Sequence, residues 1–100
     1  MTKMKKLSSE EIQAQLPSLS GWTLKDGKLH REYKFADFVA AFGWMTSVAI
    51  TAQAQDHHPE WFNVWNKVVV NLTTHDAGGI SDRDFKLAGE MNKLAAGRTT

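Results

Sequence analysis

Apolar residues recur at helical spacing between residues 36 and 55. Steps of three and four place them on one side of a helix, which is typical of a helix packed on a sheet. The stripe consists of Phe38, Phe42, Met45, Ala49 and Ala52. No strong N-cap residue precedes it. Pro59 disfavours helical geometry in the residue before it, so the helix should end at or just before His57 and His58.

The N-terminal third of the chain predicts one helix and one hairpin. Ser8 followed by Glu11 has the spacing of a capping box, which predicts a helix over Ser9–Leu16. Asp26–Gly27 is a hairpin signal, because a two-residue turn needs positive φ angles that these two residues tolerate. The two strands that it joins should lie near Trp22–Lys25 and Lys28–Phe35.

A second β-rich stretch follows the histidine pair. Apolar side chains alternate with polar ones, which indicates one face on a core and the other in water or against another surface. The apolar set is Val64, Val68, Val70 and Leu72, and the polar set is Lys67, Asn71 and Thr73. Trp65–Asn66 is a candidate turn that would give a short strand and a longer one, but the alternation alone fits one strand or two.

After a predicted loop over residues 75–81, the chain should end in a helix. Ser81 is a candidate N-cap, with Asp84 at the third helical position. The buried stripe should consist of Leu87, Met91 and Leu94, and Gly97 should end the helix.

The order helix–strand–strand–helix–strand–strand–helix predicts an α+β fold: a four-stranded antiparallel sheet with three helices packed on one face. One hundred residues are enough for a single domain, residues 1–100, but its core is small, so burying further surface in an oligomer would stabilise it. The open face of the sheet and its edge strands should be wet, blunted or paired with another subunit.

Composition narrows the classes of function. The chain has no cysteine, which excludes disulfides and thiolate zinc sites and fits a cytoplasmic location. The formal net charge of +1 predicts no general attraction to nucleic acid or to anionic membranes. We expect neither a signal peptide nor a membrane span, since no apolar run approaches the roughly 18 residues that one needs.

Two adjacent histidines, His57 and His58, are the strongest candidates for chemistry, and four interpretations apply. They could interact with the negative end of a helix dipole. They could bind metal, although adjacent residues point in different directions and rarely share an ion. They could activate a nucleophile, but no serine has a nucleophile-elbow context. They could act as general acids and bases, because imidazole titrates near neutral pH.

His75 supports acid–base chemistry, since it follows the longest predicted strand, where site residues are often placed on a rigid scaffold. If the helix before the histidine pair packs on that strand, the three histidines would line one pocket. Asp56 and Asp76 would join them, beside indole surface from Trp22 or Trp61, whereas His30 is expected to lie on the surface.

The stretches "DHHPEWFNVWNKV" and "LTTHDAGGISDRDFKLA" resemble the signature of the pterin-4a-carbinolamine dehydratase family, and the likeness spans about Leu16–Ala95. This resemblance implies a hydro-lyase that removes water from 4a-hydroxytetrahydropterin, giving quinonoid dihydropterin. The pterin would then be recycled for an aromatic amino acid hydroxylase. It implies no metal and no organic cofactor. Histidine acid–base catalysis fits, because dehydration requires one proton delivered and one removed.

The resemblance also implies roles for individual positions. Its catalytic residues match His57, His58 and His75. Its substrate-binding residues match Asp56, Thr73, Thr74, Asp76, Trp22 and Asp84. Asp84 is better explained as a helix-capping residue, and Trp22 is equally explained as a half-buried residue at a strand start. The family usually has an ionisable residue four positions before the first histidine, where this chain has Gln53, so a glutamate there should shift the pH–rate profile upward.

Two expectations concern partners. The resemblance implies a homodimer or homotetramer in which sheet edges pair across subunits. The alternative to an enzyme is a non-catalytic binding or assembly module, since animal members of the family also stabilise the dimer of a homeodomain transcription factor. Loss of activity without loss of fold in histidine variants would distinguish the two.

Overall fold

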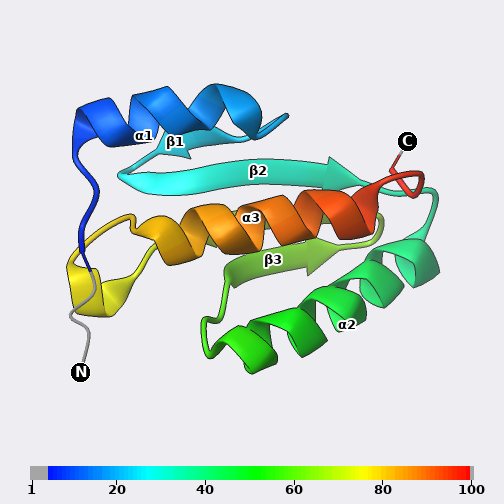
Figure 1. Ribbon diagram of the computed structural model, residues 1–100. Coiled ribbons are helices and arrows are strands. Elements are labelled where there is room, and N and C mark those ends of the chain that lie inside the picture. The colour runs from blue at the N-terminus through cyan, green and yellow to red at the C-terminus, as the bar shows by residue number, and fades with distance from the viewer. Residues whose placement is uncertain (1–4, 100) are drawn as a thin grey trace.

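The computed structural model describes residues 5–99, so residues 1–4 and 100 of the predicted domain lie outside it. Helices and strands follow one another in the predicted order (Figure 1). The elements are α1 (Ser9–Gln15), β1 (Thr23–Lys25), β2 (Lys28–Lys34), α2 (Phe38–Gln55), β3 (Glu60–Val64), β4 (Lys67–Leu72) and α3 (Asp82–Ala95). Two 3₁₀ turns, η1 (Leu16–Ser18) and η2 (His75–Ala77), complete the order.

The four strands form one antiparallel sheet in the order β1-β2-β4-β3. Both hairpins have two-residue turns: Lys25 pairs with Lys28, and Val64 pairs with Lys67. Positive φ angles at Asp26 (52°), Gly27 (78°) and Trp65 (49°) allow these turns. The predicted Asp26–Gly27 turn is therefore confirmed, and the second β-rich stretch is two strands rather than one.

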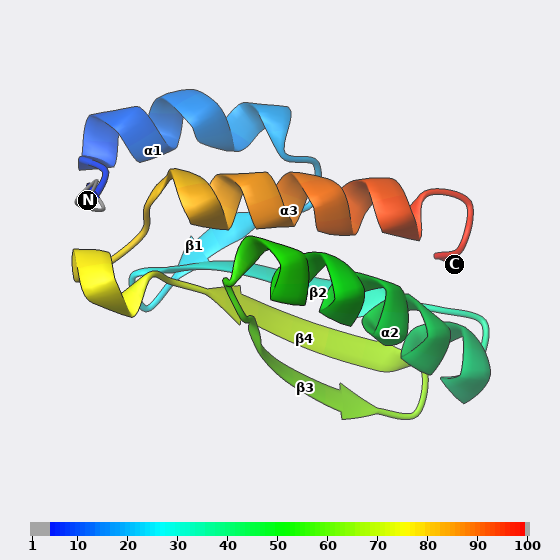
Figure 2. The same cartoon turned by 60° about the horizontal axis from the view of Figure 1, so that its bottom comes forward.

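The helices cover one face of the sheet (Figure 2), which confirms the predicted α+β fold. Val68, Val70 and Leu72 of β4 point into this core and are at most 1% exposed. Val64 was assigned to the same buried set, and that assignment is wrong. The turn at Trp65 places Val64 opposite Lys67, on the open face of the sheet, where it is 52% exposed.

The buried side of α2 is only partly the predicted one: Ala52 is buried and Met45 is partly buried against the core, but Ala49 is exposed. Phe38 and Phe42 were expected to face the sheet but are 48% and 54% exposed. The buried stripe is instead Ala41, Trp44, Val48 and Ala52. Apolar residues surround most of α2, so more than one side has helical spacing, and tertiary packing selects the side that carries Trp44.

Trp44 anchors α2 to the rest of the core. Its indole ring lies 4.4 Å from the Tyr33 ring and 5.3 Å from the Phe35 ring, both on or next to β2. Its Nε1–H donates to the Met91 carbonyl of α3 at 3.1 Å, so burial leaves no unsatisfied donor. This one side chain therefore fixes α2 against both the sheet and α3.

The ends of the helices follow local signals. Both capping boxes form, at Ser8 with Glu11 and at Ser81 with Asp84. α2 has an N-cap that the sequence analysis did not identify: Asp37 accepts a hydrogen bond from the Ala40 N–H at 2.8 Å. None of the helices within residues 5–99 is long and apolar enough to cross a membrane.

Candidate active site

Three chain segments meet at one end of the sheet and form a cleft of about 260 Å³. The first is the end of α2, where Asp56 adopts a left-handed conformation (φ 51°) and Pro59 prevents further helix. The second follows β4, and the third is the N-terminus of α3. The cleft is lined by Asp56, His57, His58, Thr73, Thr74, His75, Asp76 and Arg83.

The cleft brings the three predicted histidines together, along with four of the predicted binding residues: Asp56, Thr73, Thr74 and Asp76. Asp84 lies beneath it, with its side chain fully buried. Trp22 is not brought to the cleft. It is buried in the core, and its Nε1–H donates to Asn92 Oδ1 at 3.0 Å, so the structure favours its explanation as a packed residue at a strand start.

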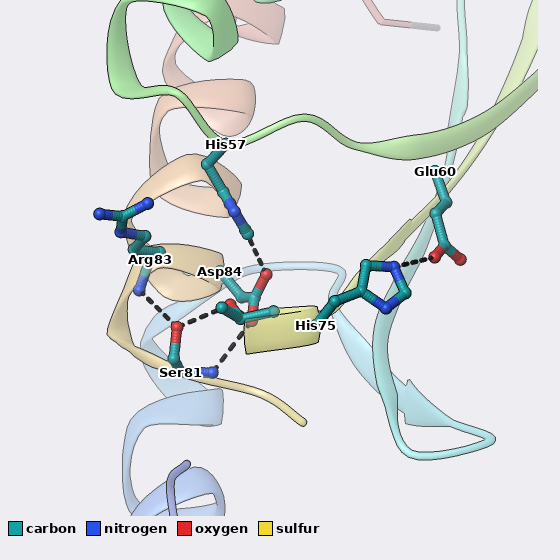
Figure 3. Close-up of polar contacts among 7 residues, drawn as sticks. His57, Glu60, His75, Ser81, Arg83 and Asp84 are labelled. Atoms are coloured by element: carbon teal, nitrogen blue, oxygen red, sulfur yellow. Dashed lines mark hydrogen bonds and ion pairs between the residues drawn. The ribbon is translucent and has the colours of Figure 1, made fainter. Parts of the chain in front are cut away.

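His57 is held by the buried carboxylate of Asp84. Its Nε2 lies 2.6 Å from Asp84 Oδ1, and its side chain is 8% exposed (Figure 3). An ionised carboxylate only accepts hydrogen bonds, so the His57 Nε2 carries the hydrogen. In the neutral ring, Nδ1 is then the free acceptor.

Asp84 is in turn fixed by its own donors. Its Oδ2 accepts from the Thr74 hydroxyl at 2.8 Å and from the Ser81 N–H at 2.9 Å. The Ser81 and Thr74 hydroxyl oxygens lie 2.7 Å apart, and the Thr74 hydrogen is already donated to Asp84, so Ser81 donates to Thr74. Asp84, at the third position of α3, therefore both completes the capping box and orients His57, which confirms its explanation as a helix-capping residue.

His58 has a different partner. Its Nε2 lies 3.0 Å from the amide oxygen of Gln53, one turn earlier on α2. This position is where the family resemblance implies an ionisable residue. The amide can hydrogen-bond the ring but cannot balance an imidazolium charge.

His75 lies on η2, so the predicted loop over residues 75–81 contains a 3₁₀ turn. Its Nε2 is 3.4 Å from Glu60 Oε2, and its ring points toward Glu60, on the side away from His57 (Figure 3). Glu60 also pairs with Lys28, whose Nζ lies 2.5 Å from Oε1. The hydrogen bond from Lys28 is the main reason that the pKa of Glu60 is lowered from its ordinary value.

Two residues near the site were missed in the sequence analysis. Arg83 lines the cleft because it lies in the first turn of α3, which Ser81 caps. Glu60 reaches His75 only because β3 and β4 are neighbours in the sheet. The quoted motif contains Glu60, but its spacing from His75 gives no sign of contact before the strands are paired.

Within residues 5–99, no group of three or more His, Asp or Glu side chains is arranged to hold a metal ion. The cleft instead presents three imidazoles, each with a defined Nε2 partner: a buried carboxylate, an exposed carboxylate and an amide. Positioned imidazoles of this kind can deliver and remove protons at neutral pH. The fold and the site define an α+β protein whose cleft is lined by three histidines.

Comparison with known proteins identifies the family. Residues 5–94 match the family described as pterin 4 alpha carbinolamine dehydratase. A protein of Solibacter usitatus (strain Ellin6076), provisionally named a pterin-4-alpha-carbinolamine dehydratase, is 61% identical over 92% of this chain and 97% of its own length. One of Rhizobium johnstonii, named in the same way, is 52% identical over 94% of this chain and 95% of its own length.

A solved structure agrees with the sequence comparison. The crystal structure of a transcriptional coactivator/pterin dehydratase from Brucella melitensis has a TM-score of 0.88 and 43% identity, covering 91% of this chain and 99% of that one. The chain therefore belongs to the pterin 4 alpha carbinolamine dehydratase family, and the predicted membership is confirmed. Membership makes it a hydro-lyase by class.

Proposed function

We propose that the protein dehydrates 4a-hydroxytetrahydropterin to quinonoid dihydropterin by histidine acid–base catalysis. The observation that carries the proposal is the convergence of His57, His58 and His75 on one cleft, together with membership of the dehydratase family. The cleft volume of about 260 Å³ is close to the lower end of the usual range for small-molecule sites, about 300–1,000 Å³.

The reaction needs two proton transfers and no change in oxidation state. One proton is delivered to the 4a-hydroxyl, the C4a–O bond breaks, and water leaves. A second proton is removed from N5, and the electron pair of that N–H bond forms the C4a–N5 double bond. Transfer through positioned groups accelerates such steps by about 10²–10⁴-fold.

The three histidines are suited to these transfers in different ways. His57 has its Nε2 hydrogen directed at Asp84, which leaves Nδ1 as the proton acceptor of the neutral ring. His75 is paired with a carboxylate that balances the charge of an imidazolium. His58, Asp56, Thr73 and Asp76 contribute polar groups that would hydrogen-bond the edge of the pterin ring. The Thr74 hydroxyl is already bonded to Asp84 and Ser81, so its part is to hold Asp84 in place.

The test is the decay of 4a-hydroxytetrahydropterin, followed by ultraviolet absorbance with no added metal. The wild-type protein should accelerate the decay, and His57→Ala and His75→Ala should lose most of the acceleration. His75→Ala is the cleaner variant, because the side chain is 83% exposed and its removal should leave circular dichroism unchanged. His30→Ala is the matched control, since His30 contacts Asn71 away from the cleft. A wild-type rate equal to the uncatalysed one would refute the proposal.

After a separate two-electron reduction to the tetrahydro form, the product would serve again in an aromatic amino acid hydroxylase, which consumes reduced pterin and releases the carbinolamine. Support for this coupling comes from the family alone. A cytoplasmic location is consistent with the absence of cysteine from the sequence.

A homodimer or homotetramer is supported by two exposed apolar surfaces. β3 is an edge strand of the sheet and exposes Phe62 and Val64. The outer side of α2 exposes Phe38, Val39, Phe42 and Ile50. Open edges and apolar patches of this kind are usually covered by a partner. Sedimentation of wild-type protein should give a mass above one chain, and Phe42→Glu should reduce it, whereas the exposed charge change Lys86→Glu on α3 should not.

A non-catalytic binding role is the second candidate, and the exposed apolar side of α2 favours it. Of the proteins compared, the Brucella melitensis protein is described as a coactivator as well as a dehydratase. If the protein acts only by binding a partner, Phe42→Glu should abolish its function in the cell, whereas His75→Ala should not. If the protein acts by catalysis, His75→Ala should abolish that function.

A further inference from the structure

Glu60 lies in the middle of a row of three ionisable side chains that crosses three strands of the sheet. Lys28 is at the start of β2, Glu60 is at the start of β3, and His75 follows β4, the strand between them. Glu60 pairs with Asn71 in the register, so its side chain lies at the end of the sheet near the cleft. One oxygen of Glu60 faces Lys28 at 2.5 Å, and the other faces His75 at 3.4 Å.

The arrangement repeats, at the surface, what Asp84 does in the interior. In both cases a carboxylate oxygen faces the Nε2 of a cleft histidine. Asp84 is immobilised by buried donors from Thr74 and Ser81. Glu60 is 43% exposed and has no such surroundings, so Lys28 is the group that restrains it.

Lys28 also secures the charge of Glu60. Because its hydrogen bond lowers the pKa of Glu60, the carboxylate is ionised throughout the range near pH 6.5 in which imidazole ordinarily titrates. Asp76 is adjacent to His75, and Asp56, His58 and Arg83 line the same cleft, but Glu60 is the partner with which His75 forms an ion pair.

Folding stability does not explain the pair. The His75 side chain is 83% exposed, and ion pairs between exposed groups contribute little to stability. The separation of 3.4 Å is longer than a formed hydrogen bond, and contacts of this kind in active sites often tighten when the substrate binds.

We propose that Glu60 is a positioning residue for His75: held by Lys28, its carboxylate directs the Nε2–H of the ring and leaves Nδ1 to exchange a proton within the cleft. The inference rests on the proposed dehydratase function. Glu60 acts through His75 and does not touch the reacting atoms.

The first experiment compares Glu60→Gln with Glu32→Gln in carbinolamine turnover. Both variants remove one negative charge from the open face of the sheet. Glu60 is on β3, whereas Glu32 is an exposed residue of β2. Glu60→Gln should lower kcat at least about tenfold, with KM within about twofold and an unchanged melting temperature. Glu32→Gln should leave kcat unchanged. Equal kcat values for the two variants would overturn the inference.

The second experiment measures the His75 ring directly and separates this inference from the dehydratase proposal. Imidazole ¹⁵N shifts, recorded at about pH 8 where an ordinary imidazole is neutral, report which nitrogen carries the hydrogen. Wild-type His75 should be in the Nε2–H form, and Glu60→Gln should mix the two tautomers. If wild-type protein has no turnover, the dehydratase proposal fails, and the positioning claim is still decided by these shifts. Identical His75 tautomer ratios in the wild-type protein and in Glu60→Gln would refute the positioning claim.

A third comparison tests the part assigned to Lys28. Lys28→Met should lower kcat in the same direction as Glu60→Gln but by less, because the carboxylate remains and only its restraint is lost. The double variant should be no slower than Glu60→Gln, since Lys28 acts only through Glu60. Fully multiplicative losses would show that Lys28 acts independently and would remove it from the proposal.

Discussion

Replacement of Asp84 by asparagine tests the link between the fold and the site. The buried carboxylate accepts three hydrogen bonds, from His57 at 2.6 Å, Thr74 at 2.8 Å and Ser81 at 2.9 Å. Asparagine has nearly the same shape, but it carries no charge and presents an NH₂ group in place of one oxygen. If its oxygen keeps Thr74 and Ser81, its NH₂ faces His57, whose Nε2 must then become the acceptor.

The size of the effect follows from these three contacts. Hydrogen bonds to charged groups are worth about 1.5–3 kcal/mol and neutral ones about 0.5–1.5 kcal/mol, so each retained bond loses about 1 kcal/mol. Reversal of the His57 contact adds a similar amount, which gives a total of roughly 2–4 kcal/mol. A domain of this size is usually stable by about 5–15 kcal/mol, so Asp84→Asn should still fold.

Turnover should fall by about 10²-fold or more, because the wrong tautomer of His57 removes a positioned proton acceptor. Urea unfolding can be followed by the fluorescence of the four tryptophans, and turnover by carbinolamine absorbance. Asp82→Asn is the control: it is exposed in the same helical turn, and its charge at the helix N-terminus is worth only about 0.3–1 kcal/mol. If the two variants had the same stability and turnover, the buried network would not hold His57 as described.

Two further predictions concern pH. Burial raises the pKa of Tyr33 from 10 to about 12, so the unfolded chain loses this proton first, and about 3 kcal/mol of stability should disappear as pH rises from 10 to 12. In urea unfolding, the stability of Tyr33→Phe should not show this part of the decline with pH. Parallel curves of unfolding free energy against pH for the two proteins would contradict the prediction. Gln53→Glu keeps an acceptor beside His58 but adds a charge that favours an imidazolium, so the pH–rate profile should move to higher pH. An unchanged profile would remove residue 53 from the electrostatics of the site.

Local signals in the amino-acid sequence are sufficient for the order of the elements. Capping boxes at Ser8 and Ser81 mark two helix starts, and Asp26–Gly27 marks a hairpin, because each depends only on residues within a few positions. The same is true of the approximate end of α2, which Pro59 indicates and which lies at Gln55. Alternation does not decide whether a hairpin forms at Trp65, because it does not reveal a two-residue turn that places Val64 on the same face as Lys67 rather than Val68.

Local signals also identify most residues of the cleft. The three histidines, Asp56 and Asp76 were predicted from their positions in the chain, and Thr73 and Thr74 from the family resemblance; all of them line it. These residues belong to two short motifs at the ends of elements, where side chains of a small domain are free to form a site. Their convergence depends on the packing of α2 beside β4, which the order of elements suggests but does not fix.

Tertiary structure alone decides which side of α2 is buried and which pairs of distant residues meet. Helical spacing is present on more than one side of α2, and only packing of Trp44 against Tyr33 and α3 selects one. Glu60 meets His75, and Asp84 meets His57, across 15 and 27 positions of the chain, because neighbouring strands and a packed helix bring them together. Residue spacing indicates only the interactions between neighbours along the chain. Contacts between distant segments depend on burial and strand pairing in the whole fold.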